Sequence, residues 1–373
     1  MLNDKSLRVL VVDDTVVYRK IVSDVLAELP GVEVVGTASN GKIAMSRIAS
    51  LKPDLLILDI EMPEMSGLEV LALMRVEWPD VGAIVLSTLT QEGGEITIKA
   101  LELGAFDFIP KPQTGSMAEN REAVSNSLAP MLKAFARRQE IRRILKGKST
   151  PEGATSEKKT GPDSVGVVQR MRAITTQKRA KSDIVGIGIS TGGPNALAQM
   201  MPQLPADLGV PVLIVQHMPP VFTKALADNL DLKCGLEVKE AVDGQAIRSN
   251  VALIAPGGKQ MRVVAGAEAT TRIIRITDDP PENSCKPSVD YLFRSIAYHY
   301  VGRATGVIMS GMGSDGTLGS KLMKRNGSTI IAQDEVTSVV YGMPKEVIDA
   351  GIVDVIAPLD KIAQEICRTV KMV

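Results

Sequence analysis

The N-terminal third of the chain carries acidic residues, a hydroxyl and a lysine directly at the ends of short apolar runs. Asp13 and Asp14 follow LRVLVV, Asp59 ends DLLILD, Ser87 ends VGAIVLS and Lys111 follows FDFIP. Three carboxylates at one sheet edge would repel one another and would need a cation, and hard oxygen ligands favour Mg²⁺. An aspartate neutralised in this way can attack a phosphoryl group whose oxygens a lysine and a hydroxyl hold. A single aspartate at a strand end is usually a helix cap or a turn residue. The prediction therefore depends on the order of these residues along the chain: two aspartates, a third aspartate, a hydroxyl residue and Lys-Pro.

A second set of residues that could do chemistry lies in the C-terminal half. The run SDIVGIGIS ends in Ser190, and TGGP then precedes the helix-like NALAQMMPQL. The glycines allow a sharp turn, and free N–H groups at a helix start can hold an oxyanion. His217 follows the run PVLIVQ, and Asp315 lies in the turn GMGSDG after ATGVIMS. A serine, a histidine that accepts its proton and an acid that orients the imidazole are the parts of nucleophilic acyl transfer.

Other interpretations of the second set stay open. Gly186 and Gly188 begin a dinucleotide-binding G-x-G-x-x-G pattern, but Thr191 stands where the third glycine is required. A histidine at a strand end can be structural, and GMGSDG can be a structural turn or a phosphate cradle. Asp290 is a rival acid, although N-capping of a helix would explain it. His299 lies in an amphipathic pattern typical of packing or surface positions. There is no G-x-S-x-G elbow, and the order Ser…His…Asp differs from that of α/β-hydrolases.

Two stretches of alternating strand and helix patterns must position these residues. The apolar, strand-like runs lie at residues 7–12, 32–38, 54–59, 81–87, 106–110, 182–190, 211–216 and 304–310. The helix-like segments between or after them lie at 17–29, 41–51, 67–78, 95–104 and 195–204. This alternation predicts an α/β protein with two doubly wound parallel-sheet domains, whose sites form beyond the carboxyl ends of the strands.

Length and charge divide the chain into three parts. A length of 373 residues favours two domains. Residues 1–112 hold 10 basic and 17 acidic side chains, whereas residues 113–182 hold 15 basic and 6 acidic ones. Much of that middle stretch is rich in Ser, Thr, Gly and Lys and is predicted to be a linker. We expect a solvated tether rather than a nucleic-acid contact. The predicted divisions are a domain at 5–125, a linker with a preceding helix at 126–182, and a domain at 183–373.

The composition excludes several classes of protein. A hydrophobic fraction of 45% excludes a wholly disordered chain. No apolar run is long enough to span a bilayer, and the first residues lack the apolar stretch of a signal peptide, so a cytoplasmic protein without membrane insertion is expected. Three widely spaced cysteines predict neither a disulfide framework nor a cysteine zinc site. The sequence has no coiled-coil pattern that would predict an oligomer, so a monomer is expected.

Residues 7–112 resemble the receiver domain of two-component response regulators. The resemblance is carried by the motifs VVDD, LDIEMPEMSGLE, VLSTLT and GAFDFIPKP. It implies a flavodoxin-like fold, and phosphorylation of Asp59 by a histidine kinase as phosphodonor. It also implies that Asp14 and Asp59 bind Mg²⁺ directly, with Asp13 binding it through water.

The same resemblance implies a set of switch residues. Ser87 is the expected switch hydroxyl, Phe108 the expected switch aromatic, and Lys111 the cation that contacts the phosphoryl group. Ser66 stands where many receivers have aspartate. We expect that departure to matter little.

Residues 183–370 resemble the catalytic domain of chemotaxis protein-glutamate methylesterases. The motifs are GISTGGP, VQHMPPVFTKALADNL, APGG, PSVDYLF, SGMGSDG, AQDE and YGMPKEVI. The resemblance implies a Rossmann-like domain in which Ser190, His217 and Asp315 form a catalytic triad. It also implies that Thr191 and the backbone near Met312 shape the oxyanion region, and that the esterase needs no cofactor.

Two positions depart from the pattern of the methylesterase family. Members commonly show His-x-Pro-Ser-Val-Asp, whereas Cys285 stands in the histidine's place here. They commonly show APGG-x-His-Met, whereas Gln260 precedes Met261 here. Both departures concern contacts with the substrate rather than the triad. Cys285 could be a second nucleophile, but the sequence pairs no histidine with it, so a structural role is predicted.

Together, the two resemblances imply hydrolysis of glutamate γ-methyl esters on methyl-accepting chemoreceptors. Deamidation of receptor glutamines would pass through the same kind of tetrahedral intermediate. The unphosphorylated receiver is predicted to cover or restrain the active site, and phosphorylation to release it. A receiver-regulated binding module without turnover is the alternative. A DNA-binding response regulator is favoured only by the basic linker, without a helix-turn-helix signal, so no nucleic-acid partner is expected.

Overall fold

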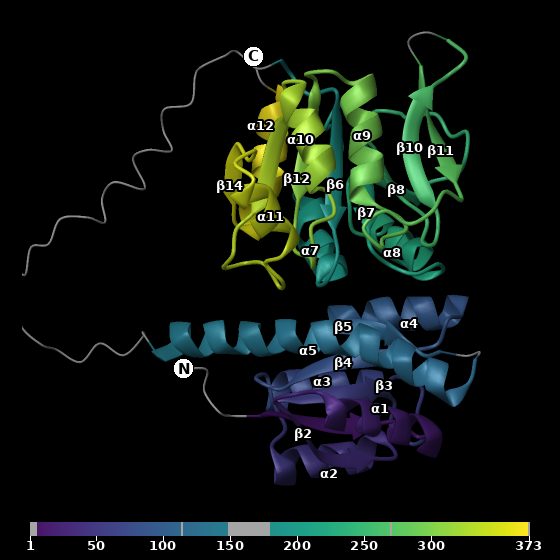
Figure 1. The fold of residues 1–373 in the computed structure, drawn as a ribbon, viewed down its shortest axis with the longest axis vertical. Coiled ribbons are helices and arrows are strands. Elements are labelled where there is room, and N and C mark those ends of the chain that lie inside the picture. The colour runs from purple at the N-terminus through teal and green to yellow at the C-terminus, as the bar shows by residue number, and fades with distance from the viewer. Residues whose placement is uncertain (1–5, 113–114, 148–179, 269–270, 372–373) are drawn as a thin grey trace, which may run out of the picture.

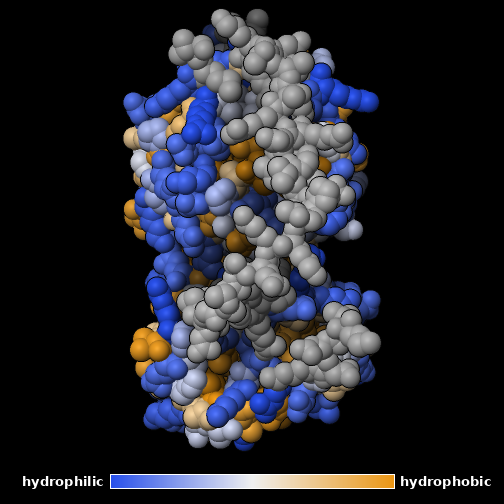
Figure 2. Space-filling model, turned by 90° about the vertical axis from the view of Figure 1, so that its left-hand side faces the viewer, coloured by the Kyte–Doolittle hydropathy of each residue, from blue (hydrophilic) through white to orange (hydrophobic). Residues whose placement is uncertain are grey.

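The computed structural model describes residues 6–112, 115–147, 180–268 and 271–371. Two α/β domains are stacked along the long axis of the molecule, and helix α5 lies on the side of the first domain that faces the second (Figure 1). On the face drawn in Figure 2, hydrophilic residues predominate and hydrophobic ones form only scattered patches. No helix among the described residues combines the length and apolar character needed to cross a bilayer.

The N-terminal domain is a five-stranded sheet with the order β2-β1-β3-β4-β5, in which every paired neighbour is parallel. This order is that of flavodoxin-like folds, as predicted. Its central strands are fully or almost fully buried, which explains their continuous apolar runs. The strands are β1 (Leu7–Val12), β2 (Val32–Ala38), β3 (Leu55–Asp59), β4 (Gly82–Ser87) and β5 (Asp107–Pro110). The helices are α1 (Val16–Glu28), α2 (Gly41–Leu51), α3 (Gly67–Glu77), α4 (Gln91–Glu102) and α5 (Met117–Gly147).

Local signals set the start of two of these helices. Asn40 accepts a hydrogen bond from the Ile43 N–H and caps α2. Ser66 and Glu69 form a reciprocal capping box at α3. The departure at Ser66 therefore has a structural use, because the serine satisfies a free N–H group at the helix start.

The C-terminal domain is a seven-stranded parallel sheet with the order β14-β13-β12-β6-β7-β9-β8. The strands are β6 (Ile184–Ile189), β7 (Val212–Gln216), β8 (Glu237–Glu240), β9 (Val251–Ile254), β12 (Ala304–Ile308), β13 (Thr329–Gln333) and β14 (Val355–Ala357). The helices are α7 (Gly193–Met200), the short 3₁₀ helix η2 (Met201–Gln203), α8 (Phe222–Asp231), α9 (Val289–His299), α10 (Thr317–Arg325), α11 (Met343–Asp349) and α12 (Leu359–Lys371). The predicted α/β class with two parallel-sheet domains is thus confirmed.

An antiparallel hairpin was not predicted. It consists of β10 (Gln260–Ala265) and β11 (Arg272–Thr277), and it packs beside α9 (Figure 1). The hairpin and the loop that follows it bring Gln260 and Cys285 next to the start of α9.

The chain order of the second sheet reverses at β6. From β6 the chain moves to β7 on one side, and it later returns to place β12 on the other side. Crevices at such switch points lie beyond the carboxyl ends of the strands. The segments that follow β6, β7 and β12 carry Ser190, His217 and Asp315.

One apolar cluster continues from the first domain into the second. It includes Ile98 and Phe108 of the receiver-like domain and Phe222 and Ala225 of the other. The rings of Phe108 and Phe222 lie 4.5 Å apart at an interplanar angle of 42°. Such ring pairs contribute roughly 0.5–1.5 kcal/mol beyond the area they bury. The two domains are therefore joined by packing of the kind found in domain cores.

Helix α5 takes up much of the basic middle segment. It begins at Met117 and ends at Gly147, so the predicted boundary at residue 125 lies within it. The rest of the predicted linker, up to residue 179, lies outside the described residues.

Candidate active site and phosphoacceptor site

The predicted acidic residues of the first domain meet at the carboxyl ends of β1 and β3. Lys111 Nζ lies 2.8 Å from Asp13 Oδ2 and 2.7 Å from Asp59 Oδ2. Asp13 and Asp59 are buried, whereas Asp14 is exposed. One oxygen of each of the three carboxylates lies within 4.8 Å of the others, a hard-oxygen donor set that fits Mg²⁺. The lysine thus provides cationic charge where the carboxylates would otherwise repel.

The pKa values of this cluster follow from burial and pairing. Burial raises the pKa of Asp59 to about 6, against the opposing charge and hydrogen bond of Lys111. Burial also acts to lower the pKa of Lys111, but Asp59 and Asp13 outweigh it and leave this pKa raised. Lys111 therefore stays charged and keeps Asp59 available as a carboxylate near neutral pH.

The expected switch residues Ser87 and Phe108 lie on the neighbouring strands β4 and β5. Thr97 Oγ1 donates to Ser87 Oγ at 2.5 Å, and Ser87 Oγ is 3.3 Å from the Gly93 carbonyl. Phe108 is 7% exposed because its ring packs on Phe222 of α8. Lys111 follows the same strand, β5, that carries Phe108, so the acidic cluster and the domain interface share one strand.

Ser190 stands on a tight turn between β6 and α7. Its N–H donates to the Ser310 carbonyl at 2.9 Å, and its carbonyl accepts from Gln216 Nε2 at 3.0 Å. Gly192 has a φ of 73°, which favours glycine, and Gly193 leaves only 1.8 Å between a notional Cβ and Gln216 Oε1. The glycines are therefore needed for both the turn and the close approach of β7.

His217 and Asp315 are hydrogen-bonded as the sequence predicts. His217 Nε2 lies 2.8 Å from Asp315 Oδ2. The carboxylate also accepts from Ser288 Oγ at 2.8 Å and from the N–H groups of Val289 at 2.7 Å and Asp290 at 3.0 Å. Burial acts to raise the pKa of Asp315, but His217 and these N–H donors outweigh it and lower the pKa. Asp315 is thus a fixed carboxylate.

Asp290 does not contact the imidazole. Its Oδ1 accepts from the Gly319 N–H at 2.6 Å, near the start of α10. The N-cap of α9 is Ser288, not Asp290 as the sequence suggested. The reason is one of register, because Asp290 is already in the first turn of the helix and faces α10.

The second imidazole nitrogen faces a thiol. Cys285 Sγ lies 3.7 Å from His217 Nδ1. Among the described residues no hydrogen bond joins the Ser190 hydroxyl to either nitrogen of His217. No histidine was predicted to pair with Cys285, and this prediction is wrong, because the loop before α9 folds back over the end of β7. Gln260 Nε2 donates to the Cys285 carbonyl at 3.3 Å, so the two departures from the family pattern are neighbours.

The pKa of His217 reflects these partners. Burial alone would lower it, but the hydrogen bonds to Asp315 and Cys285 and their charges outweigh burial and raise the pKa to about 9. A cationic imidazole paired with the Asp315 carboxylate is the arrangement that this raised pKa favours at neutral pH.

Ser190 and His217 line one pocket of about 240 Å³, and Thr191 lines it with them. Met312 is not among its lining residues and instead lines a separate cavity beside α5. The opposite wall comes from the first domain, and its residues are Asp107, Phe108, Ile109, Pro110, Ser127 and Met131. The first domain therefore covers this pocket.

Asp107 makes the most direct contact between the domains at this pocket. Its carboxylate accepts hydrogen bonds from its neighbour Phe108 and, across the interface, from the Gly192 N–H. Burial raises the pKa of Asp107 to about 7, and those two hydrogen bonds oppose the rise only in part. Asp107 was not among the predicted site residues, although an aspartate inside the apolar run FDFIP is an unusual feature of the sequence.

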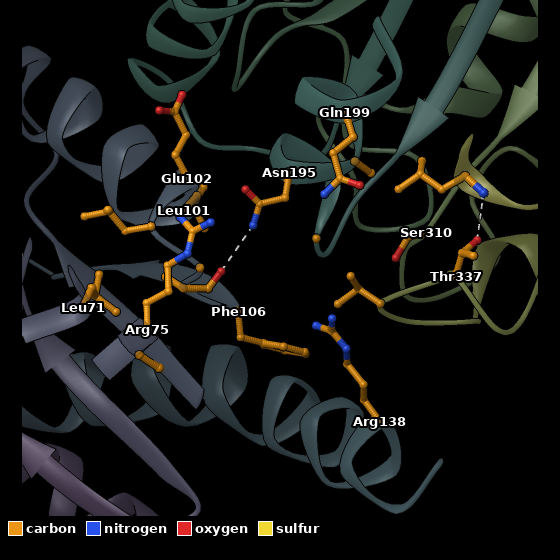
Figure 3. Close-up of a pocket in the computed structure, with 18 of the residues that line it drawn as sticks. Leu71, Arg75, Leu101, Glu102, Phe106, Arg138, Asn195, Gln199, Ser310 and Thr337 are labelled. Atoms are coloured by element: carbon orange, nitrogen blue, oxygen red, sulfur yellow. Dashed lines mark hydrogen bonds between the residues drawn. The ribbon is translucent and has the colours of Figure 1, made fainter. Parts of the chain in front are cut away.

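A larger interdomain cavity of about 660 Å³ lies nearby (Figure 3). Arg75 and Phe106 face it from one domain and Gln199 from the other, and Asn195 donates to the Ala105 carbonyl at 3.4 Å across its edge. Ser190 and His217 are not among its lining residues. This cavity marks the rim of the interface rather than the reactive pocket.

Comparison with known proteins identifies the family. Residues 9–121 match the response regulator receiver domain, and residues 185–366 match the CheB methylesterase model. A protein of Desulfotalea psychrophila, named protein-glutamate methylesterase/protein-glutamine glutaminase, is 55% identical over 99% of this chain and 100% of its own. The chain belongs to the CheB methylesterase family. The resemblances found in the sequence are thus confirmed for both domains.

Another relative spans nearly the whole chain, and a solved structure matches its second domain. A protein of Trichodesmium erythraeum with the same name is 41% identical over 97% of this chain and 99% of its own. The crystal structure of the Thermotoga maritima CheB methylesterase catalytic domain is 39% identical and has a TM-score of 0.49, covering 51% of this chain and 99% of its own.

Proposed function

We propose that this chain hydrolyses glutamate γ-methyl esters on chemoreceptors, and deamidates receptor glutamines, under control of its receiver domain. The relatives named above carry that activity in their names. The observation that carries the proposal is the shared pocket of Ser190 and His217, with His217 fixed by Asp315.

The reaction proceeds by acyl transfer to Ser190. Its Oγ attacks the ester carbonyl while His217 Nδ1 accepts the hydroxyl proton, because Nε2 is bonded to Asp315. The imidazolium then protonates the departing methoxide, and methanol leaves. Water attacks the acyl-enzyme with His217 again as base, which releases glutamate and restores Ser190. An amide follows the same path with ammonia as the leaving group.

Backbone donors at the start of α7 suit the oxyanion. The Gly193 N–H donates to the Ser190 carbonyl at 2.8 Å and Pro194 has no N–H, so the N–H groups of Thr191 and Gly192 are the proposed oxyanion donors. The carboxylate of Asp107 bonds to one of these groups in the closed arrangement. A carboxyl oxygen of the receiver therefore occupies a position that a substrate oxyanion would use.

Phosphorylation of Asp59 is the proposed trigger, with a histidine kinase as the phosphodonor. Asp13, Asp14 and Asp59 would hold Mg²⁺, which neutralises charge on the transferring phosphoryl group. Lys111 would turn from Asp13 to the phosphoryl oxygens. Since Lys111 directly follows β5, that movement would displace Phe108 and Asp107 from the second domain and uncover the pocket.

The deciding experiment measures methanol release from methylated receptor, with and without a small phosphodonor. We expect low release from the unphosphorylated chain and a clear rise with phosphodonor. Ser190→Ala should abolish release in both conditions, and Asp59→Asn should keep the chain in its low state. Methanol release by Ser190→Ala at the native rate would refute the proposal.

A serine-acylating probe distinguishes the enzyme from a binding module without turnover. Labelling of Ser190, faster with phosphodonor, supports the esterase. Receptor binding without labelling or methanol release would favour the binding module.

A further inference from the structure

Cys285 shares the imidazole of His217 with the proposed nucleophile. Its Sγ is 3.7 Å from Nδ1, and the other ring nitrogen is bonded to Asp315. Cys285 Sγ, one ring nitrogen of His217 and one carboxylate oxygen of Asp315 lie within 4.8 Å of one another. Nucleophile, base and a third group that orients the base are the geometric signature of an activated thiol.

The charge of Asp315 determines which nitrogen of His217 can accept the Cys285 proton. Its pKa is lowered, so the carboxylate is ionised and accepts hydrogen bonds only. Nε2 must therefore carry a hydrogen, which leaves Nδ1 of the neutral ring as the acceptor for the Cys285 S–H. Transfer of that proton gives a thiolate beside an imidazolium that Asp315 stabilises. The raised pKa of His217 agrees with this ion pair.

The two other cysteines lack such a partner. Burial is the largest cause that raises the pKa of Cys234, to about 11, and it also raises the pKa of Cys367. Neither has a histidine among its described contacts. They serve as internal controls, because all three thiols occur in one chain.

The position of Cys285 leaves it reachable while the receiver covers the pocket. Cys285 is partly exposed, its neighbours Asn283 and Ser284 are exposed, and it is not among the residues lining the covered pocket. Cys285 Sγ also lies 3.4 Å from the Asn283 carbonyl oxygen, which is an alternative acceptor for its single S–H hydrogen.

We propose that Cys285 is a redox-sensitive thiol, activated by His217, that hydroperoxides convert to a sulfenic acid. The thiol proton passes to His217 Nδ1, sulfur attacks the near peroxide oxygen, and the O–O bond breaks. Sulfur loses two electrons and gains the hydroxyl, and the departing alkoxide or hydroxide takes the proton from His217 and leaves as alcohol or water. Two equivalents of an external thiol reverse the change, yielding a disulfide of that thiol and water.

Oxidation would stop the proposed hydrolysis, and this consequence rests on the proposed function. The sulfenic oxygen would lie against Nδ1, the nitrogen that must accept the Ser190 proton. The domain arrangement and Asp59 play no part in this control, so it would act on phosphorylated and unphosphorylated chains alike.

Site-resolved alkylation tests the activated thiol without any esterase assay. The reduced full-length chain is treated with iodoacetamide, and mass spectrometry follows each cysteine over time. We expect Cys285 to react at least about tenfold faster than Cys234 and Cys367. His217→Asn should remove that advantage while leaving the rates at the two other cysteines unchanged. A rate at Cys285 that matches the other two, or that survives His217→Asn in a folded chain, would overturn the proposal.

Peroxide treatment tests the oxidation itself. Dimedone should trap a sulfenic acid at Cys285 of the native chain and not of Cys285→Ser. Methanol release should fall on peroxide treatment and return with dithiothreitol in the native chain, whereas Cys285→Ser, compared with its own untreated rate, should resist. Trapping at Cys285 without loss of methanol release would reject the link to hydrolysis but not the thiol. If dimedone traps nothing at Cys285, the oxidation proposal is wrong even where the esterase is active.

Discussion

The protonation of His217 sets when the proposed base can work. Its pKa is raised to about 9, and only the neutral ring can accept the Ser190 proton. We therefore expect kcat/KM of the phosphorylated chain to rise with pH and to level off above about 9. The measurement is a pH profile of methanol release on methylated receptor, with phosphodonor present throughout. A plateau of kcat/KM already near pH 7 would contradict a raised pKa for His217 as the catalytic base.

The same pKa has a consequence for stability. A histidine whose folded pKa exceeds its unfolded value of about 6.5 adds stability below that value. This contribution is lost as the pH rises through about 9. Activity and the contribution of His217 to stability are therefore expected to change in opposite directions across one pH range.

Ser288 both holds the Asp315 carboxylate and caps helix α9. Its Oγ donates to Asp315 Oδ1 at 2.8 Å and lies 3.3 Å from the Tyr291 N–H, where it caps α9. Ser288→Ala should lower the free energy of unfolding by about 1 kcal/mol and reduce kcat, because Asp315 keeps only its remaining donors. Chemical denaturation and methanol release measure the two effects. Ser284→Ala in the same loop, at an exposed residue, should change neither.

At this scale the sequence predicted positions at strand ends better than contacts between loops. Ser190, His217 and Asp315 follow adjacent strands, and parallel pairing brings such ends together whatever the loops do. The partner of Cys285 could not be predicted, because it depends on how the loop after the hairpin folds back onto a residue 68 positions earlier in the chain. Ser190 likewise follows its predicted strand. Among the described residues no hydrogen bond joins its hydroxyl to His217, because that contact depends on the side-chain conformation, which the strand pattern does not determine.

At the scale of elements, β5 connects the two sites. Lys111 at its end contacts Asp13 and Asp59, and Phe108 within it packs on α8. The sequence predicted β5 from its apolar residues. The packing of β5 on α8 of the other domain could not be predicted, because a buried strand has the same pattern whether a helix of its own domain or of another covers it. The hairpin of β10 and β11 was missed for a different reason, since Arg262 and Arg275 interrupt the apolar runs of its two strands.

Phe108→Ala should loosen the contact between β5 and α8. Loss of the ring removes its packing on Phe222 and should cost roughly 3–5 kcal/mol, part of it in the closed arrangement alone. We expect methanol release by the unphosphorylated chain to rise and its response to phosphodonor to shrink.

Phe106→Ala is the matched control for this prediction. Its ring borders the interdomain cavity but packs edge-on against Phe135 of α5, 5.2 Å away, and not against a ring of the second domain as Phe108 does. It should destabilise the receiver to a similar degree without the same rise in basal release. Equal basal release from the two variants would show that general destabilisation, and not the β5–α8 contact, controls the pocket.

At the scale of the whole molecule, two separately folded sheets behave as one switch only if their interface is marginal. The shared apolar cluster favours closure, while Asp107 brings a buried carboxylate to the same interface. A carboxyl whose pKa is raised by burial disfavours the state that buries it once the group ionises. Closure should therefore be tightest at low pH and weaken as the pH rises through about 7.

Asp107→Asn separates the charge of this residue from its hydrogen bonds. The amide oxygen can still accept from the Phe108 and Gly192 N–H groups, but it carries no charge to desolvate. We expect lower methanol release from the unphosphorylated variant than from the native chain at pH 8, and a smaller difference at pH 5, where the native carboxyl is protonated in the closed arrangement. The phosphorylated variant should approach the native rate, because the opened pocket no longer contains this residue. Higher basal release from Asp107→Asn at pH 8 would mean that the negative charge itself holds the domains together, with the Gly192 N–H as its anchor.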